Sequence, residues 1–258
     1  MFKLLSRVAP VLILLSCVQA VAAPPRPTLI VAISVDQFSG DLFNEYRATF
    51  SGGLERLSEG VVFTRGYQSH AATETCPGHA TLLTGARPAR NGIIANHWLD
   101  QGLARDDKLV YCFEDEQAGG SSSRKYQVST RHLRVPTLGM RMKAATPATR
   151  VVSVAGKDRA AVLLGGAGAD ETWWWAGTGF VSYPKAPMPA AVSAVNTAIG
   201  QQLGAAQAPL PLPAFCTARD YAVTLRGGQQ VGTGRFARAA GDAKSYRVSP
   251  ALDAASLQ

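Results

Sequence analysis

The chain has 258 residues, of which 47% are hydrophobic and 17% are charged, and its formal net charge is +8. This length is enough for one domain with a sizeable core, and after the first 22 residues no apolar run is long enough to span a membrane. The basic residues are scattered without a run of five or six like charges, which argues against nucleic-acid binding.

Residues 1–22 have the pattern of a secretory signal peptide. Two basic residues flank the start, an apolar run follows, and Ala20 and Ala22 form an Ala-x-Ala ending. We therefore expect cleavage after Ala22 and export to the periplasm or the exterior. The segment before Cys17 also resembles a lipoprotein processing box, so lipidation of Cys17 is the alternative.

The run 28–35 is nearly continuous in apolar, mostly β-branched residues and ends abruptly at Asp36. This pattern predicts a fully buried strand of a parallel sheet, with the Asp36 carboxylate at its C-terminal tip. Ligands of open α/β sheets bind outside the carboxyl ends of the strands. Asp36 is thus a candidate site residue, although an aspartate there can equally cap the next helix.

The next elements lead to a second candidate residue. We expect a short helix at 54–58, a strand at 61–63, and a longer helix in which Pro77 occupies the first turn and Gly85 ends the helix. Thr75 then lies at or just before the N-terminus of that helix.

Strands and helices alternate further along the chain. We expect an amphipathic helix at 136–145, a buried strand at 150–154, and a loop at 156–159 at the carboxyl end of that strand. This alternation favours an α/β fold.

The last third contains a hairpin, a helix and a connector. The aromatic, glycine-interrupted segment 172–183 is typical of a hairpin with partly buried tryptophans, 189–203 is an alanine-rich helix, and 208–214 is a proline-rich connector. Pro250 is placed to begin a final helix at its first position.

Outside the signal segment the cysteines are Cys76, Cys112 and Cys216, which are too few for a disulfide scaffold. They form no C-x-x-C pair that would indicate a cysteine zinc site. One disulfide is possible in an oxidising compartment. Cys76 and Cys112 are the most plausible pair, and other pairings stay open.

Thr75 and Asp36 together suggest chemistry. A threonine hydroxyl is a weak nucleophile unless its alkoxide is stabilised, and a helix N-terminus favours an anion. A divalent ion shared by Asp36 and Thr75 would do this far better. For an isolated threonine, a helix cap is the commoner role.

Four separated motifs carry a family resemblance. They are S-V-D-Q at 34–37, T-E-T-C-P-G-H at 73–79, T-G-A-R-P at 84–88 and N-G-I-I-A-N-H-W at 91–98. In this order they resemble the alkaline phosphatase superfamily, and within it the bacterial threonine-nucleophile alkaline phosphatases of the Sphingomonas and flavobacterial type. These are relatives of the type I phosphodiesterases and nucleotide pyrophosphatases. The resemblance weakens after about residue 165.

The resemblance implies a fold and roles for five residues. The fold is an α/β sandwich with a mostly parallel central sheet flanked by helices. Asp36 is a zinc ligand, and Thr75 is the metal-bound nucleophile that becomes phospho-threonine. Asn96 donates to a phosphoryl oxygen, while Lys157 and Arg159 contact the remaining oxygens.

The sequence departs from the family in its metal ligands. The family holds two zinc ions mainly through Asp and His motifs of its C-terminal half. Here the histidines are His70, His79, His97 and His132, and no Asp stands four before or directly before any of them. We expect His79 to support the helix start, and His97 to be no more than a supporting neighbour of Asn96. We interpret 23–258 as the N-terminal portion of the catalytic domain.

Two classes of function remain. The protein is either a hydrolase of small phosphate esters, of which this chain is one part and which we expect to be monomeric, or an inactive chain that at most binds phosphate weakly. Within the first class, Lys157 and Arg159 together suit the dianionic group of a monoester. Phosphodiester hydrolysis is the alternative.

Overall fold

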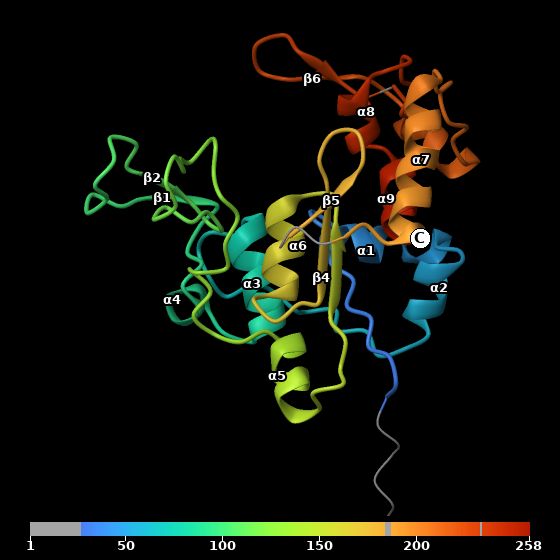
Figure 1. Ribbon diagram of the computed structural model, residues 1–258. Coiled ribbons are helices and arrows are strands. Elements are labelled where there is room, and N and C mark those ends of the chain that lie inside the picture. Colours follow the sequence, from blue (N-terminus) through green and yellow to red (C-terminus); the bar gives the residue numbers. More distant parts are fainter. Residues whose placement is uncertain (1–26, 184–186, 233) are drawn as a thin grey trace, which may run out of the picture. The chain divides into compact units, whose positions relative to one another are not determined.

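The computed structural model describes residues 27–183, 187–232 and 234–258 (Figure 1). The chain separates into two units, Met1–Val35 and Asp36–Gln258. All the helices and strands described below belong to the second unit.

Two expectations for the start of the chain fall outside this part. The signal peptide expected at 1–22 and the alternative lipidation at Cys17 both lie before the first described residue. Among the residues that are described, no helix is long and apolar enough to cross a bilayer.

The expected strands at 28–35 and 61–63 are wrong. No strand is assigned in either segment, and Leu29 and Phe63 are 76% and 85% exposed. β-Branched residues favour a strand only where neighbouring backbone satisfies its hydrogen bonds and side chains cover its faces. Neither segment is paired in a sheet of the described residues.

The first half of the second unit is mainly helical. It contains α1 (Gly40–Tyr46), the 3-10 helix η1 (Arg47–Thr49), α2 (Gly53–Ser58), α3 (Thr75–Thr84) and α4 (Pro88–Asn91). The expected end of α3 is confirmed, because Gly85 is left-handed with a φ of 66° and its amide donates to the Thr81 carbonyl over 2.9 Å. The antiparallel strands β1 (His97–Leu99) and β2 (Leu109–Tyr111) follow.

The middle of the chain forms the principal sheet. After α5 (Leu138–Ala145), the segments β3 (Val152–Ala155), α6 (Asp158–Gly165) and β4 (Glu171–Trp175) make a strand-helix-strand unit, and β5 (Phe180–Ser182) completes the sheet. β3 and β4 are parallel, whereas β4 and β5 form the expected antiparallel hairpin. The α/β class is confirmed. The sheet is nevertheless mixed rather than mostly parallel, because a short hairpin loop forces its two strands to be antiparallel.

The C-terminal third consists of α7 (Ala190–Gly204), the 3-10 helix η2 (Ala214–Arg219), β6 (Val223–Thr224), β7 (Gln230–Val231), α8 (Ala243–Arg247) and α9 (Pro250–Ser256). Both expected helices are present, and Pro250 begins α9 as its fixed φ favours.

Two apolar clusters hold these elements together. In the first, α3 and α6 lie side by side (Figure 1) and pack with β2 through fully buried residues that include Cys76, Phe113 and Leu163. The second joins the hairpin to α7, α8 and α9 around Trp175 and Tyr246. The first cluster positions the candidate site, because both helices begin beside it.

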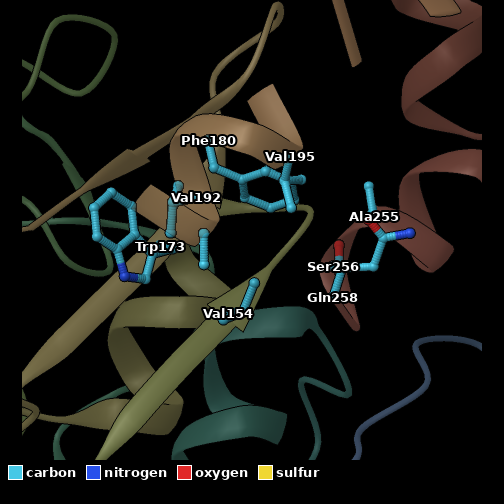
Figure 2. Close-up of a pocket in the computed structure, with 9 residues that line it drawn as sticks. Val154, Trp173, Phe180, Val192, Val195, Ala255, Ser256 and Gln258 are labelled. Carbon is cyan, nitrogen blue, oxygen red and sulfur yellow. The ribbon is translucent and has the colours of Figure 1, made fainter. Parts of the chain in front are cut away.

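A small cavity lies against the second cluster. It has a volume of ≈ 70 Å³, and Figure 2 shows Trp173, Phe180, Val195 and Ala255 among its lining residues. Among the described residues that line it there is no lysine, arginine, aspartate or glutamate. It is therefore unsuited to a phosphate group, and the candidate site lies elsewhere.

Truncating the side chain between α3 and α6 tests the first cluster. Leu163→Ala removes a side chain that is 0% exposed, so the free energy of unfolding should fall by about 2 to 5 kcal/mol. Leu82→Ala on α3, where the side chain is 53% exposed, is the matched control and should cost less than about 1 kcal/mol. Urea unfolding measures both. Equal losses of unfolding free energy in the two variants would contradict the packing of α6 in the first cluster.

Candidate active site

Thr75 is the first residue of α3, as the sequence predicted. The residue before it, Glu74, has an extended backbone but does not cap the helix with its side chain. Instead, Glu74 Oε2 accepts a hydrogen bond from the backbone amide of Asn96 over 2.6 Å. The carboxylate is thus used to fix a neighbouring loop, and the N-terminus of α3 keeps its amides for other partners.

Asp36 lies at the centre of the site. Its Oδ2 atom accepts from the Thr75 hydroxyl over 3.3 Å and from the Lys157 ammonium over 2.7 Å. These contacts join residues 39 and 121 positions apart in the sequence. The structure therefore brings three of the five predicted residues into direct contact.

Asp36 is held in its ionised form. Burial, the largest single influence, acts to raise its pKa, but the hydrogen bond and charge of Lys157, with His79 and Thr75, lower the pKa below the ordinary value. A carboxylate that is ionised and 37% exposed can accept a proton or bind a cation.

His79 bridges two parts of the site. Its Nδ1 atom lies 2.6 Å from the Thr75 carbonyl oxygen, one helical turn earlier, and its Nε2 atom lies 3.6 Å from Asp36 Oδ1. Because a carbonyl oxygen can only accept, Nδ1 carries the proton. The geometry agrees with the expected support of the helix start.

Asn96 reaches the same helix from the loop before β1. Its side-chain oxygen accepts from the backbone amide of Cys76 over 2.9 Å. Because that amide is a donor, the contact identifies Oδ1 and leaves Nδ2 as the donor end of the side chain. Asn96 therefore contacts the residue that follows Thr75, and its Nδ2 group can donate a hydrogen bond next to Thr75.

The loop expected at 156–159 is confirmed for Gly156 and Lys157, whereas α6 begins at Asp158 and includes Arg159. Lys157 is the N-cap of α6 and Arg159 lies in its first turn. The prediction was wrong for 158–159 because the first turn offers no apolar periodicity, only Asp158, which is favourable near a helix N-terminus. Lys157 contacts Asp36, whereas Arg159 Nη1 donates to the Tyr111 hydroxyl over 2.8 Å.

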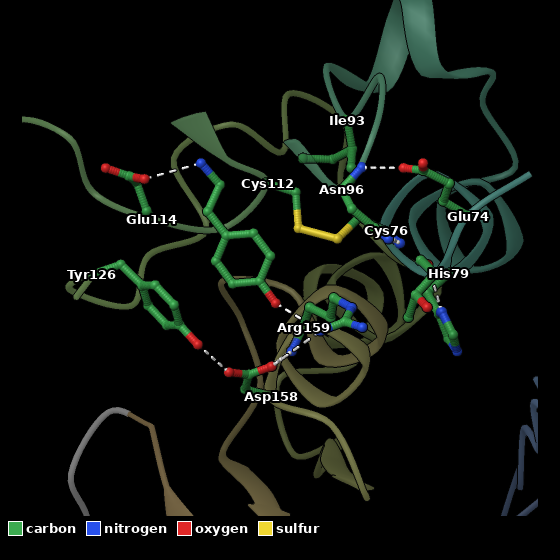
Figure 3. Close-up of a disulfide and its surroundings, with 12 residues drawn as sticks. Glu74, Cys76, His79, Ile93, Asn96, Cys112, Glu114, Tyr126, Asp158 and Arg159 are labelled. Carbon is green, nitrogen blue, oxygen red and sulfur yellow. Dashed lines mark hydrogen bonds and ion pairs between the residues drawn. A yellow bond between two sulfur atoms is a disulfide. The ribbon is translucent and has the colours of Figure 1, made fainter. Parts of the chain in front are cut away.

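A disulfide connects these parts. Cys76, next to Thr75, is bonded to Cys112, whose backbone amide donates to the Asn96 carbonyl (Figure 3). The expected pairing is confirmed. The bond ties α3 to the end of β2, so it links the candidate nucleophile to the segment that carries Tyr111.

Three features that contact the site residues or α6 were not predicted from the sequence: Glu74, Tyr111 and the Tyr126–Asp158 pair. Glu74 lies inside the T-E-T-C motif, so its position was a usable signal, but its partner Asn96 was not evident. Tyr111 and the Tyr126–Asp158 pair, joined by a 2.6 Å hydrogen bond, had no sequence signal. Their contacts with α6 span 48 and 32 positions.

The metal ligands are incomplete in the described residues. No group of three or more His, Cys, Asp or Glu side chains is placed there to hold a metal ion. A catalytic zinc ion usually has three protein ligands. Asp36 and Thr75 fit as two oxygen ligands, but by themselves they do not complete such a site.

Thiol counting tests the disulfide. In chain 23–258, exported to an oxidising compartment and then denatured without reductant, we expect one reactive thiol, that of Cys216, which is free in the structure. After reduction there should be three. Three thiols before reduction would contradict the Cys76–Cys112 bond.

The comparisons with known proteins identify the class. A family model for type I phosphodiesterase / nucleotide pyrophosphatase matches residues 30–230, and the chain belongs to this family. This finding agrees with the motifs noted in the sequence.

Particular relatives are alkaline phosphatases. The chain is 60% identical over 241 residues to the alkaline phosphatase PhoK of Sphingomonas sp, and the match covers 93% of this chain and 43% of PhoK. The chain thus spans less than half the length of this relative.

Two solved structures are similar as well. The first is wild-type alkaline phosphatase PafA, with a TM-score of 0.68 and 27% identity over 89% of this chain and 46% of that one. The second is a PafA variant in which a threonine is changed to serine and an asparagine, a lysine and an arginine are changed to alanine. Its TM-score is 0.63 at 25% identity, with the same coverage.

Proposed function

We propose that this chain supplies the N-terminal portion of the catalytic domain of an exported, zinc-dependent phosphate monoester hydrolase, with Thr75 as its nucleophile. One observation carries the proposal: a single Asp36 oxygen is shared by the Thr75 hydroxyl and the Lys157 ammonium. A nucleophile, an ionised carboxylate and a cation for phosphate thus meet at one point.

The residues of the chain divide the work of phosphoryl transfer. The Thr75 oxygen bonds to phosphorus as the bond from phosphorus to the ester oxygen breaks, and the proton of the Thr75 hydroxyl leaves with the substrate alcohol, which produces phospho-threonine. Water then attacks phosphorus, phosphate leaves, and the Thr75 hydroxyl is restored. Asn96 Nδ2, Lys157 and Arg159 bind the non-bridging oxygens, and the N-terminus of α3 favours their negative charge.

The proposal includes a zinc ion, for which Asp36 and Thr75 are the ligands in this chain. Held by Asp36 and Thr75, the ion would lower the pKa of the hydroxyl and neutralise phosphate charge. Two such ions are expected from the family resemblance, with most of their ligands outside the described residues.

The substitutions in the PafA variant support the assignment of roles. The four residue types changed in that variant are those of Thr75, Asn96, Lys157 and Arg159. Its threonine and asparagine are 21 positions apart, and its lysine and arginine two apart, which are the spacings found here. The agreement is independent of the contacts described above.

Phosphodiester hydrolysis is the second candidate, because the family includes type I phosphodiesterases. A monoester group carries one more negative charge and one more terminal oxygen than a diester group. Two cations in addition to an amide donor match the monoester better.

Trapping the intermediate tests the nucleophile. The chain is extended with the remaining part of Sphingomonas PhoK, loaded with zinc, and assayed with p-nitrophenyl phosphate. Thr75→Ala should abolish both turnover and the acid-stable phospho-enzyme, because no other hydroxyl contacts Asp36 among the described residues.

Thr73→Ala is the control, since Thr73 is exposed two positions earlier in the chain. It should leave both readouts unchanged. Phospho-enzyme that persists in Thr75→Ala would contradict the assignment of the nucleophile.

Removing both cations tests the preference for monoesters. Lys157→Ala combined with Arg159→Ala should lower kcat/KM for a monoester by about 10²-fold or more per lost contact, and far less for a diester. The monoester-to-diester ratio of kcat/KM should therefore flatten.

The double variant Lys143→Ala with Arg150→Ala removes the same charge from surface ion pairs with Asp170 and Glu171 and should keep the ratio. If the site variant slows both substrates equally, its cations are structural and the monoester assignment fails.

A further inference from the structure

Within the described residues, the Arg159 guanidinium is anchored at only one of its nitrogen atoms. Nη1 donates to the Tyr111 hydroxyl over 2.8 Å, while the nearest carboxylate oxygen, on Asp158, is 4.0 Å away and beyond hydrogen-bond range. Asp158 has other partners, since it accepts from Tyr126 and from the Arg159 backbone amide. The phenol, rather than the adjacent carboxylate, sets the orientation of the guanidinium.

This contact leaves the opposite edge of the guanidinium without a hydrogen-bond partner among the described residues. Arg159 Nε is buried and has no hydrogen-bond partner within the described parts of the chain. Nε and Nη2 point to the same side, away from Nη1, and together they form the edge that binds two oxygens of a phosphate side by side. Leaving such a donor unpaired is costly unless a ligand occupies it.

Tyr111 is itself rigidly placed. It is 5% exposed, and its ring packs against His97, Phe113 and Tyr126 with centroid distances of 4.6, 4.8 and 4.7 Å. Its backbone amide donates to the fully buried Glu114 carboxylate over 2.9 Å. The hydroxyl thus has little freedom to follow a moving arginine.

The phenol stays neutral at ordinary pH. Burial of the ring, followed by the charge of Asp158, raises the pKa of Tyr111 above its usual value. A neutral hydroxyl accepts from Arg159 without cancelling its charge, whereas a carboxylate in that position would compete with phosphate for the cation.

The position of Tyr111 is also tied covalently to the nucleophile. The next residue, Cys112, is bonded to Cys76, which follows Thr75. One rigid segment therefore sets both the helix that carries Thr75 and the acceptor that orients Arg159.

We propose that Tyr111 is a positioning residue that turns the Nε–Nη2 edge of Arg159 toward the phosphoryl oxygens. This proposal rests on the proposed function only for the identity of the ligand. The contact between Tyr111 and Arg159 is formed within this chain and does not depend on that function.

The first test needs no activity. In the 258-residue chain, NMR of the arginine side-chain nitrogens measures how fast the Arg159 guanidinium rotates, and Tyr111→Phe should accelerate this rotation several-fold. Tyr246→Phe is the matched control, because it removes another buried phenol, one that donates to Gln202, and should not change the Arg159 signal. Unchanged rotation in Tyr111→Phe would overturn the proposal.

The second test uses the zinc-loaded chain extended with PhoK. Tyr111→Phe should lower kcat/KM for a monoester by roughly 5- to 50-fold, since misplacing a binding group slows the reaction. In an Arg159→Ala background the same change should have no further effect, because the residue it positions is gone. Additive losses would show a general structural role and overturn the proposal.

The outcomes separate the two proposals. If the extended chain binds zinc but does not hydrolyse monoesters, the proposed function fails, and the NMR result still decides whether Tyr111 anchors Arg159. Should Tyr111→Phe not fold, 3-fluorotyrosine at position 111 weakens the acceptor while it keeps the ring, and the same direction of change is expected.

Discussion

The packing of α3 against α6 is the constraint on which the candidate site depends. Each helix begins at a functional residue, and the first residue of one and the N-cap of the other both reach the same Asp36 oxygen. Two helix N-termini therefore face one point, and each contributes about half a positive charge there. If the apolar contact were lost, the cations and the nucleophile would separate even though no site residue had changed.

The elements foreseen from sequence are those whose signals are local. The end of α3 at Gly85, the hairpin at 172–183 and the start of α9 at Pro250 depend on the conformational limits of glycine and proline or on short-range pairing. The strand expected at 28–35 depended instead on neighbours that its own residues cannot specify. It stays exposed in the structure.

The candidate site shows the same division. The motifs pointed to Asp36, Thr75, Asn96, Lys157 and Arg159, and the structure joins three of them directly and sets Asn96 beside Thr75. How Arg159 is oriented could not be foreseen, because its partner lies 48 positions earlier and in a different element. A motif predicts which residues act in the site. The residues that orient their side chains depend on the tertiary fold.

The Cys76–Cys112 bond also bears on how the exported form proposed above is oxidised. With Cys216 there are three ways to form one bond, and the native loop of 36 residues is the shortest, since a bond from Cys216 to either partner closes a loop roughly three to four times longer. Closure of a flexible loop becomes rarer as its length rises to about the three-halves power. Chain statistics alone thus favour the native pair over each alternative pair by about five- to eightfold, so the spacing of the cysteines in the sequence limits misoxidation before any tertiary structure has formed.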